Sequence, residues 1–418
     1  MEAQIKQFES GLRLVFYKYD NIYSVSMGIL VKSGSRYEDE TNNGYSHFIE
    51  HLLFKGTSRR SATQISNEID SLGGTINAFT SKDTTCFYTK TGKDNLVDSF
   101  DLLADIFLNS TFAEKELNLE KRVIKEEISV DKDTPDEVCH DMLAQNLFGK
   151  TSLGQTILGT PKNINQATRE SLQAFMRLRY TPNNIVISVA GNTTFEEAIE
   201  LTQKYFESQL NKRNTNTIEV LPEFKSDFSH AFKDTEQSHI ALAYPSFSYN
   251  DSLFPATVLL AIAFGGGVSS RLFQAIREKN GLAYSVYAYN SAYSDCGYLE
   301  LYCGTNPNKL SKVVDILHKQ IDILVAKGIT EQEFLRSKSQ ILGSIKLSQE
   351  NTMSVMRSNG SQLLRTDKIK GIEEQLAEIE RVTIKDIANA TQKIFSCVPA
   401  SVYVGVKAPN YNLIKVKK

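Results

Sequence analysis

Cysteine is scarce in this 418-residue chain, and the five cysteines that it has are scattered. Their number is odd and no C-x-x-C pair occurs, so the sequence predicts neither a disulfide framework nor a cysteine-based zinc site. Reduced thiols are typical of cytoplasmic proteins, and we expect a cytoplasmic location. The chain also begins without a basic segment followed by an apolar one, as this expectation requires.

Long hydrophobic runs and an excess of charge of one sign are missing as well. The longest apolar run lies near Ala256–Phe264 and is about half as long as a membrane helix, so no membrane segment is predicted. The formal net charge is -2. Without a basic excess, the sequence favours neither a nucleic-acid partner nor binding to a membrane surface.

Strand and helix patterns occur in the same order in two parts of the chain. In each part strand-like runs come first, helices follow, and a further strand comes late, which predicts a duplicated α+β unit. The polar segment 211–222 is the predicted linker. We therefore expect an N-terminal half at 1–210 and a homologous C-terminal half at 223–418, each with a mixed or antiparallel sheet covered by helices.

The clearest chemical signal is the pattern His-x-x-Glu-His at positions 47–51. A helix that begins after Asn42–Asn43, two candidate capping residues, would carry it. On that helix His47 and His51 project from one face, where two neutral imidazoles can bind one zinc ion. Glu50 lies beside the same face as a candidate general base. The pattern is the inverzincin signature, although two histidines at this spacing also occur by chance on solvated helices.

A catalytic zinc site needs a third protein ligand and one open position, and the predicted helix over 113–130 offers candidates. Its apolar arc, at about 100° per residue, is defined by Leu117, Val123, Ile124 and Ile128. Glu120 and Glu127 fall inside this arc, whereas Glu126 falls outside it. Buried acidic groups are costly without a positive partner, so we predict Glu127 as the third ligand and Glu120 as a residue that orients a ligand or supports Glu127. A buried ion pair with Lys or Arg is the alternative, and Glu116 falls inside the arc too.

Residues 44–57, GYSHFIEHLLFKGT, resemble the signature of the pitrilysin/insulinase superfamily, and look closest to its bacterial and mitochondrial processing-peptidase branch. The resemblance implies that His47, His51 and Glu127 bind one zinc ion per chain and that Glu50 is the base. It also implies two homologous halves arranged as a clamshell around a chamber. Such a chamber would admit extended or unfolded peptides and would exclude folded proteins.

Further segments resemble the same superfamily. Residues 73–81, GGTINAFTS, are similar to its active-site edge strand, where Asn77 and Ala78 would hold the substrate backbone by strand addition. From the sequence alone, Asn77 is more typical of a turn at the end of a strand. In the second half, Arg277 and Tyr284 match an Arg/Tyr pair of the superfamily. The resemblance implies that Tyr284 donates to the oxyanion and that Arg277 anchors the substrate or Tyr284 itself.

The sequence therefore predicts a zinc-dependent metalloendopeptidase that acts on peptides, and the resemblance also implies a homodimer. One alternative is a non-catalytic assembly or partner subunit of the same fold, and another is a metal-dependent hydrolase with a different substrate. Such non-catalytic subunits usually lose part of the His/Glu set, whereas this chain keeps all of it. Three of the remaining histidines are isolated in the sequence and are predicted to be structural or exposed: His230, His239 and His318. His140 follows Cys139 on a predicted helix, and no spacing supports a metal site there.

Overall fold

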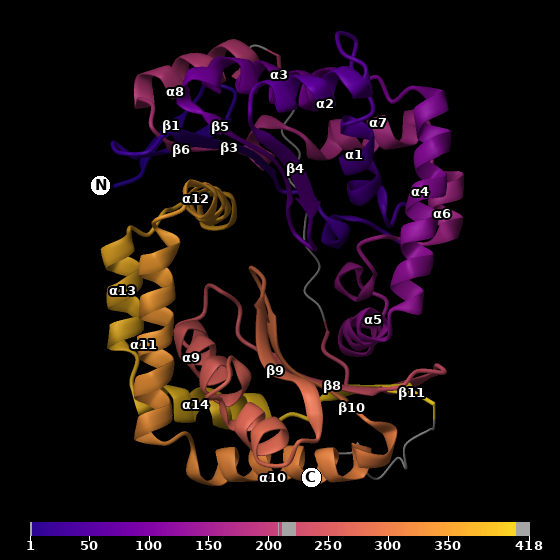
Figure 1. Cartoon of the computed structure of the whole chain (residues 1–418), viewed down its shortest axis with the longest axis vertical. Coiled ribbons are helices and arrows are strands. Elements are labelled where there is room, and N and C mark those ends of the chain that lie inside the picture. Colours follow the sequence, from indigo (N-terminus) through magenta and orange to yellow (C-terminus); the bar gives the residue numbers. More distant parts are fainter. Residues whose placement is uncertain (1, 208, 211–222, 407–418) are drawn as a thin grey trace. The chain divides into compact units, whose positions relative to one another are not determined.

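The computed structural model describes residues 2–207, 209–210 and 223–406 (Figure 1). Two β-sheets and the helices that pack on them confirm the predicted α+β class. The predicted linker 211–222 lies outside the described residues. No helix in the described part of the chain combines the length and the apolar composition that crossing a membrane requires.

These residues form the following strands and helices. The strands are β1 (Gln4–Gln7), β2 (Arg13–Lys18), β3 (Ser24–Val31), β4 (Thr75–Thr80), β5 (Thr85–Gly92), β6 (Ile185–Gly191), β7 (Phe228–Phe232), β8 (Ser238–Ser246), β9 (Ala283–Ala292), β10 (Gly297–Thr305) and β11 (Ala400–Gly405). The α-helices are α1 (Tyr45–Leu53), α2 (Ala62–Ser71), α3 (Leu96–Asn109), α4 (Glu114–Asp133), α5 (Pro135–Phe148), α6 (Pro161–Gln166), α7 (Arg169–Arg179), α8 (Phe195–Thr202), α9 (Phe254–Gly265), α10 (Leu310–Lys327), α11 (Glu331–Ser348), α12 (Thr352–Thr366), α13 (Ile372–Arg381) and α14 (Ile384–Phe395).

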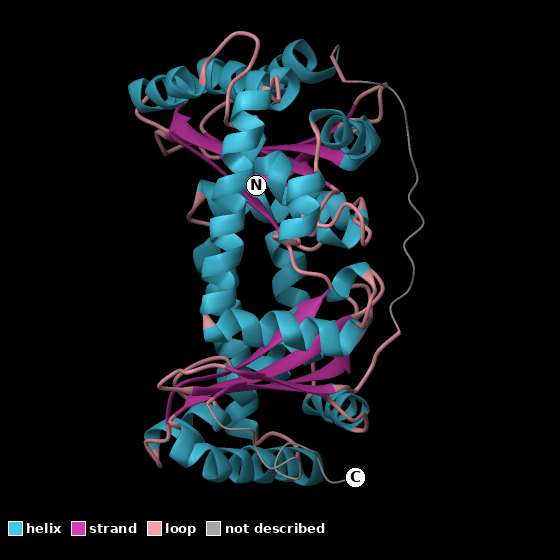
Figure 2. Cartoon of the chain, turned by 90° about the vertical axis from the view of Figure 1, so that its right-hand side faces the viewer, coloured by secondary structure: helices cyan, strands magenta, loops and turns pink. Residues whose placement is uncertain are grey.

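The first of two compact units takes its described residues from 1–128, 156–219 and 346–372. Its sheet has the order β1-β2-β6-β3-β5-β4, so β4 is an edge strand. Side chains of a strand alternate between the two faces: Met27 and Ile29 of β3 pack in the cluster that includes α1 and α3. Leu30 points to the other face and packs in a cluster with Val355 and Met356 of α12. The sheet is therefore covered by helices on both faces (Figure 2).

The second unit takes its described residues from 129–155, 220–345 and 373–418. Its sheet has the order β7-β11-β8-β10-β9. Ile240 and Leu242 of β8 pack in the cluster that includes α9, α10 and α14. Ala241 and Ala243 point to the opposite face and pack in a cluster with Leu143 of α5. This sheet is also buried on both faces, and β9 is an edge strand.

The two units exchange one helix in each direction along the sequence. Helix α12 lies late in the chain but packs on the first sheet, where Ser188 Oγ donates to the Met356 carbonyl oxygen over 2.7 Å. A Cβ at Gly360 would lie 2.4 Å from a Leu30 methyl group, so glycine permits the close approach of α12. Helix α5 lies early in the chain but packs on the second sheet. The compact units therefore differ from the predicted halves, 1–210 and 223–418, by this exchange.

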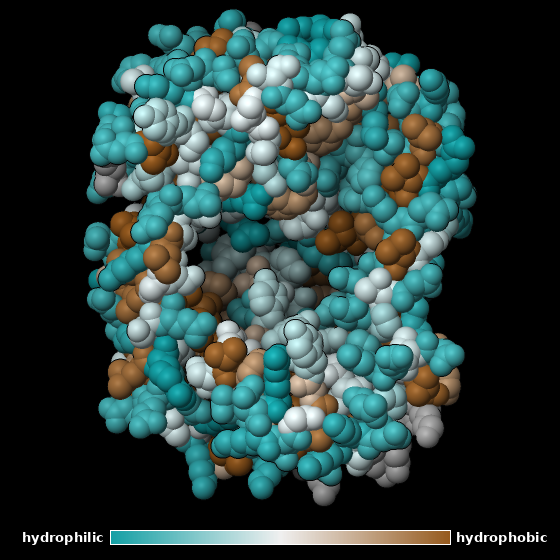
Figure 3. Space-filling model, viewed as in Figure 1, coloured by the Kyte–Doolittle hydropathy of each residue, from teal (hydrophilic) through white to brown (hydrophobic). Residues whose placement is uncertain are grey.

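The surface seen in Figure 3 is mainly hydrophilic, and its hydrophobic residues lie in small separate groups. Isolated apolar side chains on a protein surface are ordinary and need no partner to explain them.

Candidate metal centre

Helix α1, which carries the His-x-x-Glu-His pattern, begins differently from the prediction. Its N-cap is Gly44, whose φ of 100° lies in the left-handed region, and no side chain caps it. The buried carboxylate of Glu38 instead accepts hydrogen bonds from the backbone N–H groups of Gly44 and Ser46, over 2.7 and 2.6 Å. Asn43 donates to the same carboxylate, so the predicted asparagine cap is wrong. Burial raises the pKa of Glu38, and the hydrogen bonds from Gly44, Ser46 and Asn43 oppose this effect.

The two histidines of α1 lie together, as the helical spacing predicts. Their ring centroids are 4.6 Å apart. Nε2 of His51 lies 3.5 Å from Oε2 of Glu127, and Nε2 of His47 lies 3.8 Å from the same oxygen. Among the described residues, this is the one group of three His, Cys, Asp or Glu side chains whose donor atoms all lie within 4.8 Å of one another.

Glu127 lies on helix α4, on the face that the periodicity of this helix predicted to be buried. Glu120 is 1% exposed, Glu127 is half-buried and Glu126 is exposed. The prediction was wrong for Val123, which is 37% exposed. The buried face is centred on Glu120 and Ile124, and Val123 lies at its margin, so an apolar side chain there reaches solvent.

Glu120 of α4 makes two charged contacts, one with α1 and one with a lysine just after the end of α1. Its Oε2 lies 2.9 Å from Nδ1 of His51, and its Oε1 lies 2.9 Å from Nζ of Lys55. Burial raises the pKa of Glu120, but the hydrogen bonds from His51 and Lys55 outweigh burial and leave the pKa lowered. An ionised Glu120 accepts a hydrogen bond from Nδ1–H of His51, so the neutral imidazole carries its lone pair on Nε2, on the side of Glu127. Glu120 thus contacts the predicted ligand His51 and also forms the alternative ion pair with a lysine.

The donor set fits a zinc ion. Tetrahedral zinc with ligand distances of about 2.0 to 2.1 Å separates its donor atoms by about 3.3 Å, close to the 3.5 and 3.8 Å separations here. Burial, with a smaller effect of His51, lowers the pKa of His47 to about 3, so His47 stays neutral as a ligand must. Two histidines and one carboxylate also leave the fourth position open, as catalytic zinc sites do.

Glu50 lies beside this group and accepts a hydrogen bond from a residue that was not predicted from the sequence. Thr80 Oγ1, on the edge strand β4, donates to Glu50 Oε2 over 2.5 Å. Burial raises the pKa of Glu50, and the charge of Glu127 adds to this effect. The hydrogen bond from Thr80 and the charge of His51 oppose it, but the pKa stays raised. The alternation of side chains along β4 could have identified Thr80, because it places Thr80 on the same face as Ala78.

Asn77 and Ala78 lie in the middle of β4, not at a turn. Asn77 is exposed and Ala78 is half-buried. Asn77 Oδ1 accepts a hydrogen bond from the Ala78 N–H over 2.8 Å. The turn interpretation of Asn77 is therefore wrong, while the role of both residues in binding a substrate stays a prediction.

Arg277 and Tyr284 belong to the second unit and contact each other. Arg277 Nη1 donates to the Tyr284 carbonyl oxygen over 2.7 Å. The guanidinium carbon lies 4.6 Å from the centroid of the Tyr284 ring and 4.7 Å from that of Phe273, which are cation–π distances. The Tyr284 side chain is 75% exposed. Arg277 thus anchors Tyr284, one of its two predicted roles, and the reach of both residues to a substrate stays a prediction.

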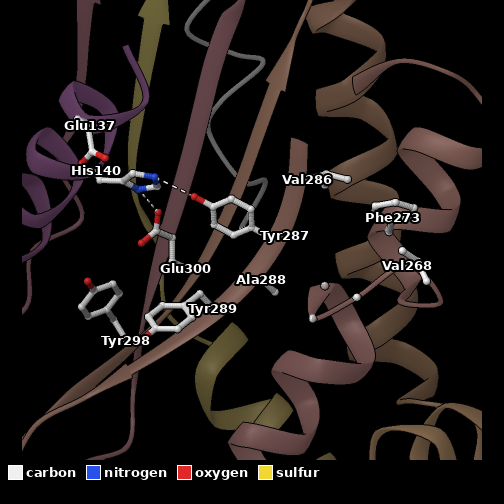
Figure 4. A pocket seen from close by; sticks show the side chains of 13 residues that line it. Glu137, His140, Val268, Phe273, Val286, Tyr287, Ala288, Tyr289, Tyr298 and Glu300 are labelled. Atoms are coloured by element: carbon white, nitrogen blue, oxygen red, sulfur yellow. Dashed lines mark hydrogen bonds and ion pairs between the residues drawn. The ribbon is translucent and has the colours of Figure 1, made fainter. Parts of the chain in front are cut away.

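The second unit also contains a pocket of about 760 Å³ (Figure 4). At one side of it, His140 of α5 lies between two residues of the second sheet (Figure 4). Its Nδ1 is 2.6 Å from Glu300 Oε1, and its Nε2 is 2.8 Å from Tyr287 Oη. Burial lowers the pKa of His140, but the hydrogen bond and charge of Glu300 outweigh burial and leave the pKa raised. His140, isolated in the sequence, is therefore part of a hydrogen-bonded group in the fold.

Two family models match the chain. One described as Insulinase (Peptidase family M16) matches residues 14–161, and one described as Peptidase M16 inactive domain matches residues 166–341. The first match contains the whole cluster of His47, His51 and Glu127. The second half of the sequence has no His-x-x-Glu-His pattern of its own, which agrees with the description of the second model.

Similar proteins match the chain over nearly its full length. One from Bacillus subtilis, named as an uncharacterized zinc protease, is 39% identical over 93% of this chain and 94% of its own length. One of the same name from Rickettsia felis is 35% identical over 96% of this chain and 97% of its own. A solved structure described as a protease from Helicobacter pylori superposes with a TM-score of 0.90 at 23% identity, covering 97% of this chain and 99% of that one, which supports the fold.

Proposed function

Because the chain belongs to the insulinase family, peptidase family M16, we propose that it is a zinc-dependent endopeptidase that cleaves extended or unfolded peptides. The observation that carries the proposal is the convergence of His47, His51 and Glu127 on one point, beside the carboxylate of Glu50. The names of the similar proteins support zinc as the metal, and so does the donor set itself.

The chemistry divides between the metal and the residues of the chain. Zinc, when bound, supplies a Lewis acid that polarises a carbonyl group and makes water a stronger acid. Glu50 takes a proton from the attacking water and returns it to the leaving nitrogen as the C–N bond breaks. The hydrogen bond from Thr80 orients the Glu50 carboxylate for both transfers, because a base must be placed before its basicity can matter.

The substrate form follows from the strand beside Glu50. Strand β4 ends the first sheet, so its outer backbone edge can pair with an added peptide strand. Asn77 and Ala78 would contact that peptide. Pairing along β4 requires a substrate segment that is extended and whose backbone groups are not already paired, which favours extended or unfolded peptides. Tyr284, anchored by Arg277, would donate to the oxyanion. The clamshell, the chamber, the homodimer and the cytoplasmic location stay predictions.

The test is a digest of a peptide library by the zinc-loaded protein, with and without chelator, and cut sites read by mass spectrometry. Chelator-sensitive cleavage is expected. A Glu50→Gln variant should retain zinc by metal analysis but lose turnover, because an amide cannot take the proton. Retained turnover would remove Glu50 as the base. No chelator-sensitive cleavage by the wild-type protein would favour the non-catalytic partner subunit.

A further inference from the structure

The edge strand β4 presents two different faces. Ile76 and Ala78 pack against the core cluster that contains α1, and Thr80 on the same side contacts Glu50. Phe79 points to the opposite side and packs in the cluster formed by α12. Side chains of a peptide strand added to β4 would alternate in the same way. Every second side chain of the peptide would therefore point to the α12 side, away from the metal centre.

Arg357 of α12 lies over this second face. Its guanidinium carbon is 4.3 Å from the centroid of the Tyr88 ring on β5 and 5.4 Å from that of the Phe79 ring on β4. In the register of the two strands, Phe79 is opposite Cys86, two residues from Tyr88. The guanidinium therefore lies over β4 and β5, the two outer strands of the sheet. It is within one strand spacing of the free edge of β4.

No carboxylate neutralises Arg357 in the described residues. The side chain is half-buried, and its Nε is buried without a hydrogen-bond partner. Arg365, two turns later on the same helix, does have a carboxylate partner, since its Nη2 lies 3.2 Å from Asp83 Oδ1. A partly desolvated cation is costly without an anion, and aromatic faces offset only part of that cost.

We infer that Arg357 binds a carboxylate of the peptide strand that pairs with β4, and so selects substrates with an acidic group on the α12 side. The inference rests on the proposed function, because it places the peptide on β4. A guanidinium and a carboxylate form the strongest class of side-chain hydrogen bonds. The carboxylate has two sources, an Asp or Glu side chain and the free C-terminus of the peptide.

The first measurement compares kcat/KM for matched peptides that carry Glu or Gln at one position in turn. The wild-type protein should favour Glu over Gln by about 10-fold, the lower range for a charged hydrogen bond, at one position and not at its two neighbours. In Arg357→Gln this ratio should fall to about 1. In the matched control Arg365→Gln it should stay as in the wild type. Free-acid and amidated peptides then distinguish the C-terminus from a side chain.

The Glu/Gln ratio of kcat/KM distinguishes a loss of selectivity from misfolding, because a misfolded protein would lose activity toward both peptides of a pair. Arg357→Lys, which keeps the charge, should retain part of the preference, and Arg357→Glu should favour Lys over Gln at the same position. If the wild type shows no acidic preference, or if Arg357→Gln keeps it, the inference is wrong. Should no peptide be cleaved, the proposed function fails, and binding of the same pairs to the protein by fluorescence anisotropy still tests Arg357.

Discussion

Glu120 offers the sharpest test of the metal centre, because it touches a predicted ligand without being one. The change to Gln keeps the size of the side chain and an acceptor oxygen for His51 Nδ1, but removes the negative charge. The carboxylate is 1% exposed and lies 2.9 Å from both His51 Nδ1 and Lys55 Nζ. Its loss weakens the basicity of His51 and leaves the orientation of the ring less strongly fixed.

The expected magnitude follows from this position. Replacing a residue that orients a metal ligand typically lowers metal affinity by about 10- to 100-fold, which is about 1.4 to 2.7 kcal/mol of binding free energy. Lys55 is one-third exposed and can turn to solvent. The free energy of unfolding of the metal-free protein should therefore fall by less than the about 3 to 5 kcal/mol of a fully buried broken pair.

The assay is a competition for zinc with a chromophoric chelator at fixed pH, using the wild type, Glu120→Gln and Glu126→Gln. Glu126 is exposed on the same helix, so its variant should bind zinc as the wild type does. An unchanged zinc affinity in Glu120→Gln would show that Glu120 serves Lys55 alone. Complete loss of zinc with an unchanged thermal unfolding curve would make Glu120 a ligand, and either result would refute the reasoning.

Three other predictions concern both units. Glu127→Gln should lower zinc content in metal analysis while Glu126→Gln should not, since only Glu127 faces the two histidines; equal effects would overturn the helix-face argument. Tyr284→Phe should lower kcat by about 10²-fold, the scale for one oxyanion donor, and an unchanged kcat would make the residue structural. Glu300→Gln should lower the pKa of His140, followed by NMR titration, because Glu300 holds that pKa above 6.5. The stabilisation from this pair should accordingly be full below pH 6.5 and decline as pH rises through the raised pKa.

The parts of the site that lie on one helix were predictable from the sequence. His47 and His51 share a face because four residues make about one turn, and Glu120 and Glu127 share one because seven make about two. The same argument excluded Glu126, and the structure agrees. Periodicity contains this information because it depends on the geometry of a single element and on no distant contact.

Contacts between distant segments were not predictable in this way. The hydrogen bond of Thr80 to Glu50 joins a strand to a helix across 30 residues, and that of His140 to Glu300 spans 160. Helix α12 shows why. Its apolar residues indicate a helix with a buried face, but nothing in their spacing says which sheet that face covers. The exchange of α5 and α12 between units was missed for the same reason.

The predicted metal site and the predicted oxyanion donor lie in different compact units. All predicted ligands, the base and Thr80 lie in the first unit, at positions up to 128, and Glu38 and Glu120 fix α1 against its neighbours within that unit. The first unit therefore contains everything that the predicted metal site requires. Tyr284 and Arg277 lie in the second unit, so a change there should alter turnover and leave zinc affinity unchanged. A change at Glu120 should have the opposite pattern. It should lower zinc affinity, and it should lower turnover at saturating zinc to a smaller extent.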